Sequence, residues 1–214
     1  WQVLDEAVLK VVYMKNILRL FLLWSLLVFA SGGLANVKSA QQAVQEATDQ
    51  LLAKLVQIQP LYSADPEKFF AEVDLTLAPF IDFSGFSKGV MAKYYRRATD
   101  AQIARFESVF RQGLIRTYAK ALVEFDNQRV EFVNTTAAES EPDRASIDLQ
   151  IYGQQGAVYR VNYNLVLIGS DWKLRNVTIE GVNVGLQFRS QFAAYMDKYS
   201  NNIDEVISHW TLDV

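Results

Sequence analysis

The chain has 214 residues, of which 50% are hydrophobic, 13% aromatic and 21% charged. This composition excludes a largely disordered protein, and at roughly 100–200 residues per domain the length allows one compact domain or at most two small ones. The 21 Lys and Arg residues against 24 Asp and Glu residues give a net charge of −3. We therefore expect no nucleic-acid partner.

Cysteine is absent and His209 is the single histidine. This excludes disulfides, thiolate nucleophiles, zinc sites built from Cys and His, and Ser-His dyads that do not use His209. His209 lies between Ser208 and Trp210 near the end of the sequence, and we interpret it as a structural or surface residue. The sequence thus argues against a hydrolase or a zinc enzyme, and we predict no catalytic residues, no metal and no cofactor.

The N-terminal segment has the layout of a secretory signal peptide. A short basic stretch at 14–19 precedes an apolar run at 20–30, and small residues follow at 31–35. The apolar run is about half of the roughly 20 residues that a membrane-spanning helix needs. We expect 1–35 to be a precursor extension and a cleavable signal peptide, with an uncleaved anchor as the alternative, and 36–214 to form a single domain.

Helices are predicted first along the remaining sequence. Apolar residues recur at helical spacing over 37–58, which predicts an amphipathic helix that ends before Pro60. Asp65 and Pro66 follow as an N-cap and the residue favoured at the first helical position. They predict a second helix, which Pro79 ends.

A third, short helix is expected over 87–95, after an interruption at 82–86. Thr99 and Gln102 have the spacing of a capping box, and the apolar residues that follow predict one long helix. Two further helices are expected near the end of the chain, over 187–199 and 202–210.

After about residue 123 the apolar pattern changes to a period of two, which is typical of β-strands. The segments 147–151 and 159–168 each have one strongly apolar face. In the next strand the apolar positions change phase after Leu174, which indicates a bulge or a strong twist. With a first strand over 130–137, short turns connect four strands into an antiparallel meander.

This order of elements predicts an α+β fold, in which N-terminal helices pack on a curved four-stranded sheet and C-terminal helices follow. A strongly curved sheet leaves a cleft between its concave face and the helices. Most apolar residues are expected to be ordinary core. As a group, however, a subset could line an elongated apolar pocket: Phe83, Phe86, Val90, Met91, Phe106, Phe110, Val161, Tyr163, Leu165, Trp172, Leu174 and Ile179.

Basic residues are concentrated between Lys88 and Lys120, where two acidic residues accompany them in an otherwise acidic protein. One interpretation is a solvated helix face. The other is a docking surface for an anionic lipid headgroup or an acidic partner protein. For that second interpretation we assign Lys93, Arg96 and Arg97 to the mouth of the pocket.

Several short motifs, in one order from about residue 37 to the C-terminus, together resemble a known family. They are Asp82-Phe83, Met91–Lys93, Arg97–Thr99, Phe106–Phe110, Trp172–Asn183 and Phe188–Phe192. The family is MlaC, also called the toluene-tolerance family. The sequence departs from its pattern at Tyr94-Tyr95-Arg96, where a stretch with Gly and Trp is expected.

The resemblance implies an NTF2-like fold and a soluble phospholipid carrier in the periplasm of Gram-negative bacteria. Members hold lipid acyl chains in their interior and maintain the lipid asymmetry of the outer membrane. The implied partners are a phospholipid ligand, an inner-membrane ABC transporter complex with an MCE-domain subunit, and an outer-membrane lipoprotein complex. On this basis we expect no enzyme activity, and the predicted pocket would hold the acyl chains.

Two other functions stay open. An enzyme of the same fold, of the isomerase or dehydratase type, would act on a small apolar substrate with Asp82 or Asp148 as the base. No second catalytic group is identifiable at a telling spacing, however. A lipid-free interaction module would use the basic segment alone.

Overall fold

The computed structural model describes residues 38–123, 129–138, 141–152 and 157–210. The predicted signal peptide lies outside these residues. Along the chain the elements are α2 (Ala40–Ile58), α3 (Leu61–Ala64), α4 (Pro66–Leu77), α5 (Phe83–Met91), the 3-10 helix η1 (Ala92–Arg97), α6 (Asp100–Val123), β1 (Val130–Ala138), β2 (Glu141–Tyr152), β3 (Val158–Ile168), β4 (Asp171–Ile179), β5 (Val182–Asn183), α7 (Val184–Lys198) and α8 (Ile203–Ser208). None of the described helices is both long and apolar enough to span a membrane.

The strands form one antiparallel sheet in the order β1-β2-β3-β4-β5. The predicted α+β class and the meander are confirmed, with one strand more than expected. The predicted bulge is also present, because Asn164 pairs with Asn176 while the next residue, Leu165, pairs with Leu174. Arg175 is therefore the extra residue of β4.

Side-chain caps explain where several helices begin. The Ser39 hydroxyl accepts the Gln42 backbone N–H at the start of α2, and Thr99 and Gln102 form the predicted capping box before α6. The prediction for α5 was wrong in its bounds. The Asp82 carboxylate accepts the Gly85 N–H at 2.9 Å, so the helix begins at Phe83.

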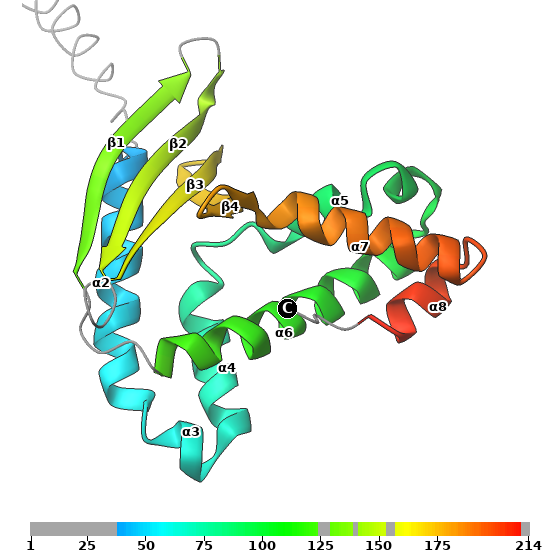
Figure 1. Ribbon diagram of the computed structural model, residues 1–214, viewed down its shortest axis with the longest axis horizontal. Helices are drawn as coiled ribbons and strands as arrows, with labels where there is room; N and C mark the ends of the chain where they lie inside the picture. The colour runs from blue at the N-terminus through cyan, green and yellow to red at the C-terminus, as the bar shows by residue number, and fades with distance from the viewer. Residues whose placement is uncertain (1–37, 124–128, 139–140, 153–156, 211–214) are drawn as a thin grey trace, which may run out of the picture. The chain divides into compact units, whose positions relative to one another are not determined.

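The two faces of the sheet differ in chemistry. Ile147, Leu149 and Val161 lie on an apolar face, and α2 crosses the sheet on this side (Figure 1). The opposite face carries polar side chains that bond to one another, since the Asn162 amide donates to Ser146 and Asp148, both at 2.7 Å. An antiparallel sheet with one covered and one solvated face has this alternation.

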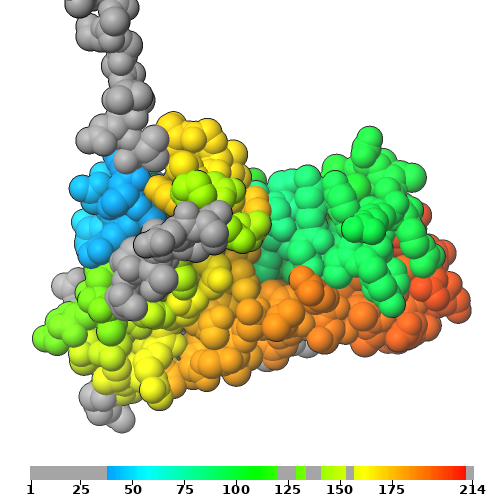
Figure 2. Space-filling view, turned by 90° about the horizontal axis from the view of Figure 1, so that it is seen from above, coloured from blue at the N-terminus to red at the C-terminus, as the bar shows by residue number. Residues whose placement is uncertain are grey.

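The remaining helices form a second layer. Helix α6 contacts α4, α5 and α8, and α5 also contacts α7. Figure 2 shows α7 lying along the segment from α5 to η1. This layer joins the sheet through α5 and α7, which both contact β4.

Candidate functional site

The predicted pocket residues of the helices lie together in a closely packed core. Phe83, Phe86, Val90, Met91, Phe106 and Phe110 are all buried. The ring of Phe110 lies 5.2 Å from that of Phe86 and 5.7 Å from that of Phe106, centroid to centroid. Residues of α7 and α8 complete this group, which we call the helical cluster.

The predicted pocket residues of the sheet lie in a different group. Val161 and Leu165 are buried against Ala40 and Val44 of α2, in what we call the sheet cluster. Three half-buried side chains pack against it: Tyr163, Trp172 and Leu174. The indole N–H of Trp172 also donates to the Lys38 carbonyl at 2.9 Å. Ile179 is 36% exposed at the end of β4.

The two clusters meet at Val177 of β4, which packs against both. Many of the apolar side chains that pack against the two clusters are covered incompletely. Beside the helical cluster they are Leu51, Leu52, Phe70, Leu77, Ile81 and Tyr118, and beside the sheet cluster they are Val130, Phe132, Ile151, Tyr163, Trp172 and Leu174. Apolar side chains that the protein itself covers incompletely can form a site for an apolar ligand.

Helix α6 shows how the core opens along its length. Phe106, Phe110, Leu114 and Tyr118 are four residues apart and therefore share one side of the helix. The first two are 0% exposed and Leu114 is 8% exposed, whereas Tyr118 is half-buried. Tyr118 was not among the predicted pocket residues, although its place in this row was a usable signal.

The surrounding protein changes the pKa of two tyrosines, Tyr118 and Tyr163. Burial raises the pKa of the Tyr118 hydroxyl and that of the Tyr163 hydroxyl, because the tyrosinate anion would lose hydration. Both hydroxyls, like those of other tyrosines, are protonated at neutral pH and can donate a hydrogen bond.

The two carboxylates considered as catalytic bases have other partners. Asp82 is buried, caps α5 and forms an ion pair with Arg175, whose Nε lies 2.7 Å from Oδ2. Asp148 lies on the polar face of the sheet and accepts the Asn162 amide. The two carboxylates therefore do not lie together at the apolar face of the sheet.

The basic segment divides into paired and unpaired residues. Three arginines of α6 form ion pairs with neighbouring helices: Arg105 with Asp204, Arg111 with Asp74, and Arg116 with Glu67. Arg105 and Arg116 are exposed, whereas Arg111 is half-buried and its guanidinium lies 4.8 Å from the ring centroid of Phe83. The side chain of Lys120 lies outside those that the structure describes.

The predicted docking residues lie on η1. Lys93 is exposed and its ammonium lies 5.0 Å from the ring centroid of Tyr94. Arg96 and Arg97 are exposed and form no ion pair or hydrogen bond with any described residue. Tyr94, where the sequence departs from the expected motif, packs 5.8 Å from the ring of Phe192. The 3-10 helix η1 therefore carries exposed positive charges, while Tyr94 packs it against α7.

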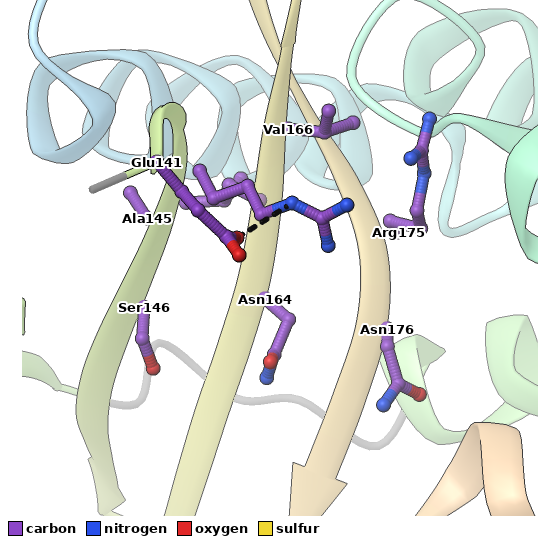
Figure 3. Close-up of a pocket in the computed structure, with 9 residues that line it drawn as sticks. Glu141, Ala145, Ser146, Asn164, Val166, Arg175 and Asn176 are labelled. Carbon is purple, nitrogen blue, oxygen red and sulfur yellow. Dashed lines mark ion pairs between the residues drawn. The ribbon is translucent and has the colours of Figure 1, made fainter. Parts of the chain in front are cut away.

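A depression of about 400 Å³ lies on the solvated side of the sheet (Figure 3). Ser146, Asn164 and Asn176 lie side by side on β2, β3 and β4 and line it, with the ion pair of Arg144 and Glu141 at one end. Leu165 and Val166 also line it, but its amides and charged groups do not suit a hydrocarbon chain. The candidate site for an apolar ligand is therefore the opposite face.

Comparisons with known proteins agree with this arrangement. The family model of the MlaC protein matches residues 45–211. The toluene tolerance protein ttg2D of Pseudomonas putida is 37% identical over 178 residues, which are 83% of this chain and 82% of that protein. A phospholipid-binding protein from Ralstonia solanacearum, solved in complex with a phospholipid, is similar with a TM-score of 0.73 and 25% identity over 80% of this chain and 94% of that one. By the extent of the family match and this identity, the chain belongs to the MlaC family.

Proposed function

We propose that this protein is a periplasmic phospholipid carrier. It takes up lipid acyl chains between the helical cluster and the sheet cluster and carries the lipid between an outer-membrane lipoprotein complex and an inner-membrane ABC transporter with an MCE-domain subunit. This transfer maintains the lipid asymmetry of the outer membrane. The observation that carries the proposal is the set of incompletely covered apolar side chains on both clusters, which meet at Val177. The phospholipid bound to the similar Ralstonia protein supports it.

The physical need for such a carrier follows from the cost of exposing hydrocarbon to water. A diacyl phospholipid has about 30 methylenes, and at about 0.8 kcal/mol each their exposure costs on the order of 24 kcal/mol. A protein interior that replaces water with apolar side chains removes most of this cost. It needs no catalytic group, and we propose that the protein is a carrier and not an enzyme.

Residues 1–35 fit this proposal as an export signal that is removed, which leaves 36–214 as the single lipid-binding domain.

Lys93, Arg96 and Arg97 supply the charge that docks the carrier to its partners or to lipid headgroups. Exposed charges accelerate encounter without adding a permanent apolar contact, which suits a protein that must leave each membrane again.

The site is tested by placing charge on the apolar face of the sheet. Val161→Glu should remove the phospholipid that co-purifies with the protein, because an unpaired carboxylate in apolar surroundings excludes a hydrocarbon chain. Native mass spectrometry measures the lipid content. Phe132→Glu, at a half-buried position of β1, should have the same effect with less risk to folding.

Asn164→Glu is the matched control, since Asn164 is exposed on the polar face of the same strand as Val161. It should retain the lipid. Normal lipid content in folded Val161→Glu and Phe132→Glu proteins would contradict the site.

A further inference from the structure

Tyr163 places a hydroxyl group on the apolar face of the sheet. On β3 it lies between Val161 and Leu165, which point to the same face and are both buried. Across the sheet it pairs with Ile147 of β2 and Val177 of β4. The residue therefore lies beside the point where the two apolar clusters meet, and its hydroxyl is the polar group of that row.

This hydroxyl has no hydrogen-bond partner among the described residues. Tyr163 is half-buried among apolar side chains, and polar groups in such surroundings are usually paired, so its hydroxyl can take a partner from outside the chain. Trp210 offers a comparison, because within the described residues its indole Nε1 is the side-chain nitrogen that is both unpaired and sealed from solvent. The Tyr163 hydroxyl is not sealed in this way, so it borders space that a ligand group can enter.

We propose that the Tyr163 hydroxyl donates a hydrogen bond to an ester carbonyl oxygen of the bound phospholipid, an inference that rests on the proposed function. The ester carbonyls are the first polar atoms above the acyl chains, and they accept hydrogen bonds but cannot donate them. A neutral donor satisfies such an acceptor without burying a charge. The apolar clusters hold the chains, and Tyr163 fixes how deep they enter.

The proposal predicts discrimination between ester and ether lipids. The probes are dipalmitoyl phosphatidylglycerol and its dihexadecyl ether analogue, which differ in the carbonyl groups and share the headgroup. The two lipids compete for the delipidated protein, and native mass spectrometry measures the ratio of the two complexes. The ester lipid should bind about fivefold more tightly, which corresponds to one ordinary hydrogen bond. Tyr163→Phe should reduce this ratio to about one.

Tyr159→Phe is the matched control, because Tyr159 lies on the same strand and face but is 48% exposed, so water satisfies its hydroxyl. It should keep the wild-type ratio. The stability of the lipid-free protein gives a second readout. Tyr163→Phe breaks no internal hydrogen bond and should not lower the urea midpoint, whereas a merely structural hydroxyl would.

The outcomes separate this inference from the function on which it rests. If neither lipid binds to the wild-type protein, the carrier function itself is wrong. If both lipids bind but the wild type does not prefer the ester, or Tyr163→Phe keeps the preference, then the carbonyl contact is wrong while the carrier function stands.

Discussion

Gly85 leaves room for the ion pair that joins α5 to the sheet. A Cβ atom at this position would lie 2.6 Å from Arg175 Nε and would also overlap the Asp82 carboxylate. Neither group can move freely, because Asp82 caps the helix while it binds Arg175. The smallest side chain is therefore required here by packing.

Gly85→Ala should lower the free energy of unfolding by about 2 kcal/mol. The added methyl group would separate the largely buried Asp82 carboxylate from Arg175 and from the backbone N–H of residue 85. Urea denaturation measures the change. Gly89→Ala in the same helix is the control, since nothing lies within 4 Å of its added Cβ. It should raise stability by about 1 kcal/mol through helix propensity. Equal effects of the two substitutions would refute the packing argument.

At the scale of elements, ion pairs hold α4 between α2 and α6. Lys54 Nζ of α2 lies 2.6 Å from Glu72 Oε2, and Arg116 of α6 donates from Nη1 to Glu67 Oε1 at 2.8 Å. The hydrogen bond from Arg116 lowers the pKa of Glu67, and that from Lys54 lowers the pKa of Glu72. Both carboxylates are thus more acidic in the folded protein than in the unfolded chain.

The stability from these two pairs should be present above about pH 4.5 and lost as the pH falls through the lower folded-state pKa values, since the unfolded chain then binds more protons. Glu67→Gln with Glu72→Gln should flatten the decrease in urea midpoint between about pH 5 and pH 3. Glu107→Gln, at an α6 residue that forms no ion pair with any described residue, should leave the decrease unchanged. A decrease of the same steepness in the double variant would show that other groups cause it.

The elements show which parts of the fold the sequence could predict. The caps at Asp65 and Thr99 depend on residues within one helical turn, so spacing alone was sufficient. The cap at Asp82 is equally local, but Gly85 and Gly89 disfavour a helix, so the sequence indicated an interruption there. Strand β5, at Val182–Asn183, has two residues and therefore no period.

The candidate site could be predicted less completely, for a related reason. Alternation along β3 correctly placed Val161, Tyr163 and Leu165 on one face. Periodicity puts Phe106 and Tyr118 in the same row of α6, however, and only the packing of neighbouring elements decides which is sealed and which stays half-buried. The degree of cover is a tertiary property, so a sequence pattern does not contain it.

For the whole molecule, the distribution of charge predicts how the carrier meets its partners. Arg96→Glu with Arg97→Glu should slow lipid exchange with the membrane complexes by about tenfold at low salt, because steering by exposed charge is lost. Lipid content and folding should be unchanged. Exchange rates of fluorescent phospholipid measured over a range of ionic strengths test this, since the difference should shrink as salt screens the charges.

Single reversals supply the control for net charge. Arg97→Glu and Lys68→Glu change the charge of the protein equally, but Lys68 lies on α4 and Arg97 on η1. Only the first should slow exchange. Equal rates would return the basic segment to the interpretation of a solvated helix face.

The division of the apolar core into two clusters that meet at Val177 has a consequence for turnover of the protein. Lipid bound between the clusters would complete the core, and any ligand that binds the folded state alone stabilises it by mass action. The empty carrier is then the form that opens more often, and proteases act on opened chains. Its lifetime in the cell would rise and fall with the supply of cargo, so that the amount of carrier follows the traffic it serves.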